Sequence, residues 1–588
     1  MAGTAAVSGG HVAGETLDPE EILAALDDEQ RRVAVALRGP VRVLAGAGTG
    51  KTRALTHRIA YGIATGTYAP DRVLALTFTQ RAAGEMRTRL RDLGAGGVSA
   101  RTFHASALRQ LNYFWPQITG SPAPRVIEGK GRPLAEAATS LGLKLDTATL
   151  RDVAAEVEWR KVSNLTLDEY GRRAASRALP GALTLEQSVD LQRAYEKLKD
   201  DRASIDFEDV LLLTAGLLES EPRVALQVHE QYRFFVVDEY QDVSPLQHRL
   251  LELWRGDRVD VCVVGDASQT IYSFTGATSD YLLNFDNEFP QAITVGLERN
   301  YRSGAPIVRV ANELMRDRAG ALVLQAIRDG GPTPTVTAFP SDHEEAYGVA
   351  SRIKSDIESG TPASDIAVLY RTNAQSANLE RALGEASVNY QVAGATRFFD
   401  LPDVKRALLA LRGQSVTQTA DPLFKSVSDV LRALGWTQAP PESSGAIRAK
   451  WEALNALIEM ADEAPPGTTL RAFTDTLMAR AEARHEPTLN AVTLASVHSV
   501  KGLEWKNVYI VGVAEGLMPI SYASGVDAVA EERRLLYVAI TRACERLHLS
   551  WAASGTAHRH VRRASRFLAE CGTNTLREVS SGSGASGR

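Results

Sequence analysis

A short glycine-rich segment constrains the fold of this chain more than any other feature. The apolar run Val41–Ala45 predicts a strand, which leads directly into AGAGTGKT at residues 45–52 and then into a helical pattern. Glycines let the backbone curl so that its N–H groups face an anion, and a following helix N-terminus adds positive charge. The segment matches G-x-x-x-x-G-K-[ST] except for Ala45 at the first glycine. It therefore predicts a phosphate-binding loop in an α/β domain.

Alternating strands and helices extend this prediction along the chain. Eight short apolar runs bounded by turn residues indicate buried parallel strands: Val41–Ala45, Val73–Phe78, Phe234–Val237, Val261–Val264, Ile293–Leu297, Ile366–Tyr370, Val492–Val497 and Val508–Val511. Helical patterns lie between them, which is typical of α/β sheets. Because the runs fall into two groups, before and after about residue 297, we expect two α/β cores.

Two long segments without predicted strands interrupt these cores. Residues 105–205 and 376–487 are mostly helical in period, and we interpret both as insertions. The first 16 residues and the glycine- and serine-rich end, residues 571–588, are expected to be disordered or flexible.

Composition excludes several classes of protein. The 588 residues carry 66 Lys and Arg against 71 Asp and Glu, a net charge of −5, so any site for nucleic acid must be local. No apolar run is long enough for a membrane helix, and the N-terminus has no signal-peptide pattern. The three cysteines, Cys262, Cys544 and Cys571, have no CxxC spacing, which disfavours a zinc site and fits a reducing cytoplasm.

An acidic pair supplies the second half of the predicted phosphate chemistry. Asp238 and Glu239 follow the strand Phe234–Val237, at the strand end where α/β sheets bind ligands. We expect Asp238 and Thr52 to hold Mg²⁺ and Glu239 to activate the attacking water. Lys51 would neutralise the β- and γ-phosphates. Without the phosphate loop, the same pair would indicate only a solvated strand end.

Besides the phosphate loop, further motifs follow one another along the chain: Leu26–Gln30, Thr77–Ala83, Thr102–His104, Asp206–Asp209, Asp238–Asp242, Val264–Phe274, Leu297–Ser303, Tyr370–Ser376, His498–Trp505 and Glu531–Ala543. In these motifs and in their order, the chain resembles the UvrD/Rep/PcrA-type superfamily-one helicases over about residues 17–570. Within that family it looks closest to the short actinobacterial second UvrD-type helicase. The resemblance implies two RecA-like domains, 1A (17–104 and 206–296) and 2A (297–375 and 488–570). The insertions 1B (105–205) and 2B (376–487) would belong to them, and ATP would lie between the cores.

The resemblance also implies the residues of the ATP site. The catalytic residues would be Lys51, Asp238, Glu239, Gln269, Arg302 and Arg542. Gln269 would sense the γ-phosphate, and the two arginines would contact it, a task suited to the planar, permanently charged guanidinium. Gln30 would recognise adenine between Arg53 and Tyr301, and Glu504 would contact the ribose. The full nucleotide-binding set is Gln30, Ala47, Gly48, Thr49, Gly50, Lys51, Thr52, Arg53, Tyr301, Arg302, Glu504 and Arg542.

Single-stranded DNA is the polymer that the resemblance implies as partner. Aromatic platforms and polar groups that face phosphates suit such a strand. The implied contacts are Phe78, Thr79, Phe103, His104, Tyr272, Phe274, Arg371, Asn373 and His498. Phe274 and Thr275 depart from the usual Trp and Arg of the family. Basic clusters at 81–101 and 558–566 fit a phosphate track or a solvated helix face.

These inferences predict a 3′–5′ DNA helicase that depends on ATP and Mg²⁺. It would move along single-stranded DNA and unwind duplex at single-strand/double-strand junctions. We expect it to act in bacterial DNA repair with other repair proteins. It would be cytoplasmic, at the nucleoid, and not bound to membranes. The short second insertion, 376–487, keeps open a translocase that displaces proteins from DNA and unwinds weakly. A phosphate-loop kinase that ignores DNA and a non-catalytic DNA-binding scaffold are less favoured alternatives, because they leave the DNA-facing or the catalytic motifs unexplained.

Overall fold

The computed structural model describes residues 18–174, 179–180, 183–393, 399, 401–415, 421–438, 446–462, 464–483, 490–555, 561–572 and 574–580. The chain forms two compact units. Unit 1 comprises the residues up to Tyr301 together with Asp317–Leu324, and unit 2 comprises Arg302–Arg316 together with the residues from Gln325 onward. Within the described ranges, no helix is both long enough and apolar enough to cross a lipid bilayer.

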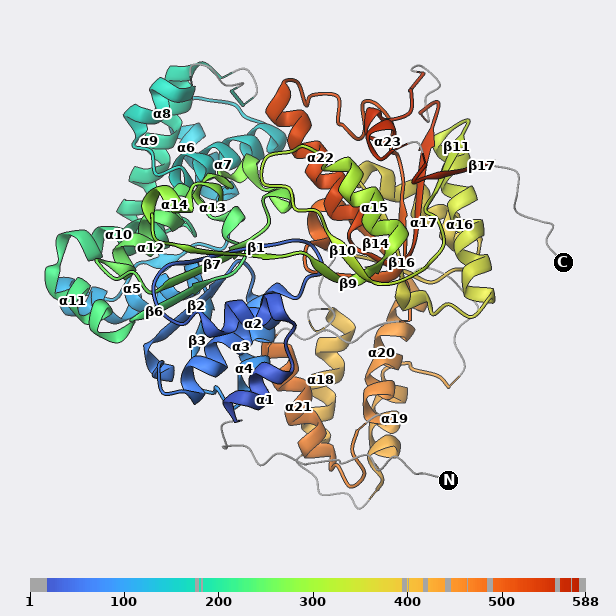
Figure 1. Cartoon of the computed structure of the whole chain (residues 1–588), viewed down its shortest axis with the longest axis horizontal. Coiled ribbons are helices and arrows are strands. Elements are labelled where there is room, and N and C mark those ends of the chain that lie inside the picture. Colours follow the sequence, from blue (N-terminus) through green and yellow to red (C-terminus); the bar gives the residue numbers. More distant parts are fainter. Residues whose placement is uncertain are drawn as a thin grey trace. The chain divides into compact units, whose positions relative to one another are not determined.

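Unit 1 is built on a six-stranded parallel sheet with the order β3-β2-β6-β7-β1-β8 (Figure 1). The strands are β1 (Val41–Ala45), β2 (Val73–Thr77), β3 (Ser99–Thr102), β6 (Phe234–Val237), β7 (Val261–Gly265) and β8 (Ile293–Leu297). Because all of them run the same way, the loops that follow them meet at one edge of the sheet.

Helices cover both faces of this sheet, which is why its strands read as continuous apolar runs. In β2, Val73 and Ala75 pack into one hydrophobic cluster, whereas Leu74 and Leu76 pack into the other. The first cluster includes residues of α2 (Asp28–Val35), α3 (Lys51–Ala64) and α4 (Gln80–Asp92). The second includes residues of α5 (Phe103–Thr119), α10 (Asp209–Ser220), α11 (Pro222–Gln231), α12 (Pro245–Arg255) and α14 (Phe285–Glu288). Helix α1 (Pro19–Ala24) contributes Ile22 to the first cluster, and α13 (Asp280–Leu283) contributes Leu282 to the second.

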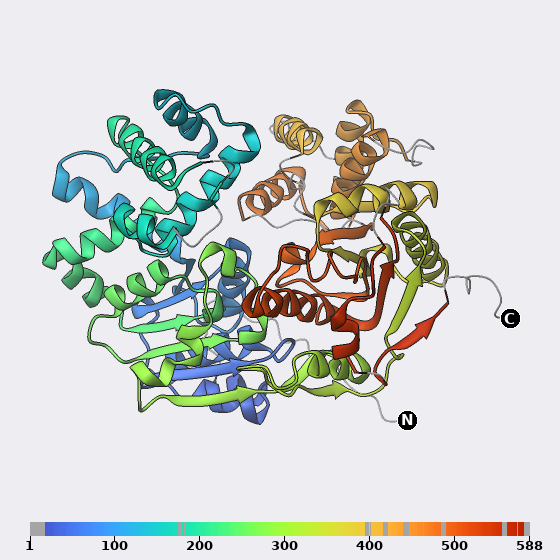
Figure 2. The same cartoon turned by 90° about the horizontal axis from the view of Figure 1, so that it is seen from above.

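The first insertion is a helical group with a core of its own (teal in Figure 2). Its helices are α6 (Gly131–Ser140), α7 (Thr147–Val162), α8 (Leu167–Ala174) and α9 (Leu185–Asp201), and the short strands β4 (Arg125–Val126) and β5 (Ser204–Ile205) pair at its base. The expected start at residue 105 differs from the structure. Helix α5 packs into the sheet core through Phe103, Leu111 and Phe114, so the insertion begins after it.

Unit 2 contains a seven-stranded parallel sheet with the order β13-β14-β12-β15-β16-β11-β17. The strands are β11 (Thr335–Phe339), β12 (Ile366–Tyr370), β13 (Tyr390–Val392), β14 (Val492–Ser496), β15 (Trp505–Ile510), β16 (Ala543–Ala552) and β17 (Arg577–Val579). The predicted fold class, two parallel α/β cores with helical insertions, is confirmed. Strand β9 (Arg299–Gly304) carries the chain from unit 1 into unit 2, and β10 (Gln325–Arg328) follows the later return.

Helices α15 (Ala305–Leu314), α16 (Asp342–Glu358), α17 (Ser376–Glu385), α22 (Val526–Ile540) and α23 (Arg566–Glu570) accompany this sheet. The second insertion consists of α18 (Pro402–Ser415), α19 (Leu423–Ala433), α20 (Ala446–Asp462) and α21 (Leu470–Ala483), which share a separate apolar core (orange in Figure 1).

Two expected boundaries in unit 2 differ from the structure. Helix α17 packs on the sheet, and β13 is one of its strands, so residues 376–392 belong to the sheet layer rather than to the insertion. The end of the chain was expected to be flexible from residue 571, yet β17 pairs in parallel with β11. The glycine- and serine-rich residues 581–588 and the first 16 residues lie outside the described ranges.

Candidate nucleotide site and DNA-binding surface

The phosphate loop of unit 1 lies between β1 and α3. Gly48 and Gly50 have φ values of 71° and 80°, a left-handed conformation that glycine adopts without steric cost. Gly50 immediately precedes the helix and offers no side-chain cap, so the first N–H groups of α3 are left for a ligand.

Neighbouring segments hold the carbonyl groups of this loop. The three bonds run from the Asn300 amide to the Ala47 carbonyl at 2.7 Å, from the Tyr301 N–H to the Gly48 carbonyl at 2.9 Å, and from the Gln30 amide to the Thr49 carbonyl at 3.0 Å. A carbonyl held on one side turns the N–H of the same peptide to the other side. The loop is therefore preorganised as a set of anion-facing N–H groups.

The side chains at the start of α3 fit a phosphate and a divalent cation. The Lys51 ammonium is buried without a hydrogen-bond acceptor among the described residues, and its nearest carboxylate oxygen, on Glu239, is 3.4 Å away. The Thr52 hydroxyl lies 3.4 Å from Asp238, which directly follows β6. A buried ammonium without an acceptor suits a phosphate oxygen, and a hydroxyl beside a carboxylate suits Mg²⁺.

A hydrogen-bonded chain joins the acidic motif after β6 to the motif after β7. Glu239 has a φ of 56°, a strained conformation for a residue with a side chain. Its carboxylate accepts a 2.5 Å bond from Gln241, whose amide oxygen accepts the Asp266 N–H at 3.0 Å. Gln269 in turn donates to the Asp266 carboxylate at 2.7 Å. Burial raises the pKa of Asp266. Gln241 and Asp266 were not among the site residues predicted from the sequence. Their hydrogen bonds link the segments that follow β6 and β7.

The three residues expected at the adenine gather around the turn that precedes α2. Gln30 is buried in α2 and holds the phosphate loop. The Arg53 guanidinium donates to the Ala25 carbonyl, and the exposed Tyr301 donates its hydroxyl to Asp27. Burial, together with that bond, raises the pKa of Tyr301 to about 12. Arg53 and Tyr301 are thus both anchored to one turn of unit 1.

In unit 2 the structure brings Arg302, Glu504 and Arg542 together around Thr541. Arg302 donates to Glu504 at 2.5 Å and to the Thr541 carbonyl at 3.2 Å. Arg542 is 2% exposed, and its guanidinium donates to the Val538 carbonyl at 3.0 Å and to the Thr541 hydroxyl at 3.2 Å. Both arginines therefore already have acceptors within their own unit.

Two aromatic pairs occupy the motifs of unit 1 that were expected to face DNA. Phe78, 39% exposed, stacks on Tyr272 with ring centroids 5.2 Å apart. His104 stacks on Phe207 at 3.9 Å, and burial lowers the pKa of His104 to about 4, so this imidazole is neutral near pH 7. Phe207 is 53% exposed and was not among the expected contacts. An exposed phenylalanine between acidic residues in Asp206–Asp209 was the signal in the sequence that could have found it.

Three other expected DNA contacts of unit 1 lie differently. Phe103 is 4% exposed and stacks on Trp254 within the core, so it offers no ring face to a base. Thr79 accepts the Ala82 N–H at 3.1 Å and thereby caps α4. Phe274 lies in a short turn, and its side chain is outside the described part.

The expected contacts of unit 2 differ in how exposed they are. Arg371 forms a buried pair with Glu532 of α22, with a closest distance of 2.8 Å. Asn373 is exposed. Burial is the main cause that lowers the pKa of His498 to about 4, and the positive charge of Arg371 adds to it. The imidazole of His498 is therefore neutral near pH 7.

The basic clusters are partly compensated. Arg562 pairs with Asp342 at 2.5 Å, and Arg566 pairs with Glu515 at 2.7 Å, so two arginines of the 558–566 cluster are compensated by acids. Arg559 lies outside the described residues. In the 81–101 cluster, Arg81 pairs with Glu85 at 3.0 Å.

Asp206 and Asp209 of the motif Asp206–Asp209 anchor the first insertion. The Lys161 ammonium of α7 lies 2.7 Å from Asp206 and 2.6 Å from Asp209, and Lys199 of α9 contacts the same two carboxylates. Although burial favours the neutral acid, the two ammonium groups lower the pKa of Asp206. This buried ion cluster joins the insertion to the start of α10.

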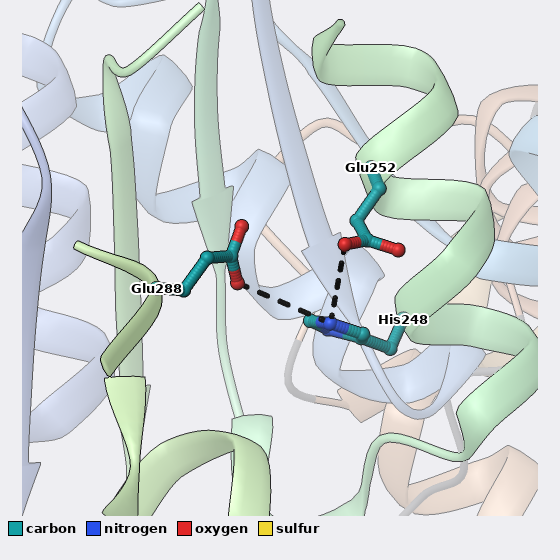
Figure 3. Close-up of side chains that lie close together, drawn as sticks. All are labelled: His248, Glu252 and Glu288. Atoms are coloured by element: carbon teal, nitrogen blue, oxygen red, sulfur yellow. Dashed lines mark ion pairs between the residues drawn. The ribbon is translucent and has the colours of Figure 1, made fainter. Parts of the chain in front are cut away.

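A His–Glu–Glu group lies on α12 and α14 (Figure 3). The Nε2 atom of His248 is 3.7 Å from Glu252 and 4.0 Å from Glu288. Burial lowers the pKa of His248 to about 4, and Arg255 binds Glu288 at 2.7 Å. His248 Nδ1 lies 3.0 Å from the hydroxyl of Tyr240, the residue after Glu239. One carboxylate of the group is thus paired with Arg255, and His248 connects the group to the acidic motif through Tyr240.

Two family models match nearly the whole chain. The model described as UvrD/REP helicase N-terminal domain matches residues 26–290, and the model described as UvrD-like helicase C-terminal domain matches residues 295–438 and 414–554. The chain belongs to the UvrD-like helicase family, and it is a DNA helicase of that type.

Its relatives carry matching names. The chain is similar to the ATP-dependent DNA helicase UvrD2 of Mycobacterium tuberculosis (strain ATCC 25618 / H37Rv), with 46% identity over 93% of this chain and 82% of that protein. It is 30% identical to the ATP-dependent DNA helicase PcrA of Leuconostoc citreum over 96% of this chain and 87% of the relative. It is 29% identical to DNA helicase II of Escherichia coli (strain K12) over 96% of this chain and 89% of the relative.

Proposed function

We propose that this helicase hydrolyses Mg²⁺-ATP to move 3′ to 5′ along single-stranded DNA and to unwind duplex at single-strand/double-strand junctions during DNA repair at the nucleoid. The observation that carries the proposal is the buried, acceptor-free ammonium of Lys51 beside a preorganised phosphate loop and a strained Glu239. The direction of movement and the repair role follow from the resemblance to the family.

Unit 1 would perform the hydrolytic chemistry. Lys51 and the loop N–H groups would bind the β- and γ-phosphates, and Thr52 and Asp238 would hold Mg²⁺, which supplies charge neutralisation when bound. Glu239 would orient the attacking water and accept its proton, because Gln241 fixes the carboxylate at 2.5 Å. The bond from Gln269 to Asp266 gives the γ-phosphate sensor a defined resting position next to this chain.

Unit 2 would supply two phosphate-binding arginines. Arg302 and Arg542 now bind Glu504 and backbone carbonyls, so each would have to exchange a protein acceptor for a phosphate oxygen. Glu504 would be released from Arg302 in the same step and could contact the ribose. Such an exchange gives each ATP cycle two alternative bonding states in unit 2.

DNA would be held by stacking and by backbone contacts, without base-edge readout. Phe78 with Tyr272, His104 with Phe207, and the exposed Asn373 are the described contacts that we propose. Phe103 is left out because its ring is buried against Trp254.

The first test is steady-state ATP hydrolysis with Mg²⁺, with and without single-stranded DNA, for the wild type and for Glu239→Gln. We expect strong stimulation by DNA and a loss of about 100- to 10,000-fold in kcat for the variant, as for the removal of a general base. Nucleotide binding by Glu239→Gln should persist. Turnover that ignores DNA would overturn the proposal.

A second candidate is a translocase that displaces proteins from DNA and unwinds weakly by itself. Residues 376–392 belong to the sheet layer of unit 2, so the second insertion is even shorter than the sequence predicted. A short second insertion favours the translocase. Strand displacement and the removal of a tightly bound protein, measured on the same single-strand/double-strand substrate, would separate the two. Fast protein removal without strand separation would establish the second candidate.

A further inference from the structure

A cavity of about 560 Å³ lies along β3, the edge strand of the unit 1 sheet. We name it the arginine cavity after its lining, which includes Gln80, Arg87, Ser99, Arg101, Arg109 and Gln231. Its lining residues Gln80 and Ala105 directly follow Thr79 and His104 in the chain. The cavity and the Phe78–Tyr272 and His104–Phe207 stacks therefore share the segments that follow β2 and β3.

The charges of the arginine cavity are not balanced by acids. Three arginines line it against one acidic residue among the lining set, Asp71, whose neighbour Arg72 lies 3.9 Å from it. The Nε atom of Arg101 is buried and has no hydrogen-bond partner within the described part of the chain. Burial, together with the positive charges of Arg109 and Arg87, lowers the pKa of Arg101. Like charges that repel one another at a partly desolvated site are relieved by a bound anion.

The remaining groups of the cavity also favour an anion. Arg87 is fixed in place by a 2.7 Å bond to the Ala100 carbonyl, which leaves its other N–H groups for a ligand. Gln80 begins α4 and Ala105 lies in the first turn of α5, so two helix N-termini contribute positive potential. None of the lining residues is aromatic, so the cavity offers no platform for a base. A phosphodiester backbone, and not a nucleobase, matches this chemistry.

We propose that the arginine cavity binds phosphates of single-stranded DNA where the strand leaves the aromatic stacks of unit 1. This proposal rests on the proposed function and adds a second, sequence-independent segment to the DNA site. Strands long enough to reach both segments would gain affinity from Arg101 and Arg109. Short strands that occupy only the stacks would not.

The test is fluorescence anisotropy with oligothymidylates of about 8 and about 24 nucleotides at about 50 to 200 mM salt. The variants are Arg109→Ala, Arg101→Ala and the double replacement. The matched control is Arg223→Ala, an exposed arginine of α11 outside the cavity lining. We expect the double variant to bind the long strand about tenfold less tightly, with a salt slope smaller by about 0.7 for each phosphate that the protein no longer neutralises. Its affinity for the short strand and its kcat at saturating DNA should equal those of the wild type.

Unchanged binding of the long strand by the double variant would overturn the proposal. An equal loss for short and long strands would also overturn it, because the arginines would then act on the stacked segment or on the fold. Arg109 is exposed, so Arg109→Ala keeps the test valid if Arg101→Ala does not fold. A wild type that binds no single-stranded DNA would instead contradict the proposed function. In that case, binding of inorganic pyrophosphate by the wild type but not by the variants would show that the cavity is a site for free anions and not for DNA.

Discussion

The two units use the same architecture, but they surround the cations of their proposed sites differently. Each has a parallel sheet whose strand ends carry the motif residues. In unit 1 the Lys51 ammonium is buried without a described hydrogen-bond acceptor, and Glu239 is held in a strained conformation. In unit 2 the cations are already hydrogen-bonded, Arg302 to Glu504 and Arg371 to Glu532.

Under the proposed function, this difference separates a site that is ready to bind phosphate from one that has to rearrange first. A buried charge without a hydrogen-bond acceptor costs folding free energy and is retained where a ligand completes it. A paired arginine costs little at rest but must break a bond before it can act. Unit 1 should therefore respond to substitution mainly in activity, and unit 2 in both activity and stability.

The largest loss of ATP hydrolysis is expected on substitution of Lys51, whose ammonium has no described hydrogen-bond acceptor. Lys51→Ala should lower DNA-stimulated ATP hydrolysis by about 1,000-fold or more, since the charge that faces the phosphates is lost. Its free energy of unfolding should change little, because the substitution breaks no hydrogen bond within the described part of the chain and removes only the 3.4 Å ion pair with Glu239. Phosphate release and urea unfolding measure the two quantities, with Lys197→Ala as the exposed control. A destabilised Lys51→Ala would place this lysine in the same category as the arginines of unit 2.

Arg302 tests whether a paired arginine still contributes to catalysis. Arg302→Ala should lower kcat by about 1,000-fold, the effect typical of a phosphate-contacting arginine, and Arg302→Lys should restore part of it. Glu504→Gln should have a much smaller effect on kcat, because it weakens the resting pair and the proposed ribose contact but leaves Arg302 able to contact the phosphate. Single-turnover kinetics at saturating ATP and DNA separate these cases. Wild-type turnover by Arg302→Ala would limit this arginine to a structural role.

The Arg371–Glu532 pair should dominate the stability of unit 2. Glu532→Gln leaves the guanidinium of Arg371 buried and uncompensated, which should cost about 3 kcal/mol in the free energy of unfolding. Glu545→Gln, in the exposed pair with Arg328, should change it by less than about 1 kcal/mol. Equal effects in chemical unfolding would show that burial does not govern this pair.

The smallest effect is a pH dependence confined to unit 2. Burial raises the pKa of Glu345 from 4.5 to about 7, while the Gly512 N–H and the Ser550 hydroxyl donate to one of its oxygens. The folded state thus holds a proton that the unfolded state has lost, so this group's contribution to stability falls as pH rises from about 4.5 to about 7 and is constant above that. Glu345→Gln keeps the acceptor oxygen and should remove this slope in thermal unfolding between about pH 4.5 and 8. A slope identical to that of the wild type would contradict the assignment.

The sequence predicted the buried strands well because burial on both faces leaves a continuous apolar run. The predicted runs Val41–Ala45, Phe234–Val237, Ile293–Leu297 and Ile366–Tyr370 coincide with β1, β6, β8 and β12. Strands β3, β13 and β17 were missed because short edge strands carry little apolar pattern. Strand β16 was missed because Glu545 and Arg546 interrupt it near its start.

The insertion boundaries were harder to predict for a different reason. A helical period shows which residues are apolar but not which surface they contact, so α5 and α17 could not be assigned to their sheets. The same limit applies to the site. The motifs located Lys51, Asp238 and Glu239, whereas the supporting bonds of Gln241 and Asn300 depend on tertiary contacts that a linear pattern does not contain.

The path of the chain between the units limits how the nucleotide-binding half can be isolated. Residues 317–324 return to unit 1 after α15, and there the Leu324 side chain occupies the space where Gly46 of the phosphate loop lacks a Cβ atom. A fragment that ends at residue 301 would therefore lose the cover of its own loop. A genetic dissection of this enzyme must therefore place its cut after residue 324, and the nucleotide-binding half then carries residues 302–316 of unit 2 with it.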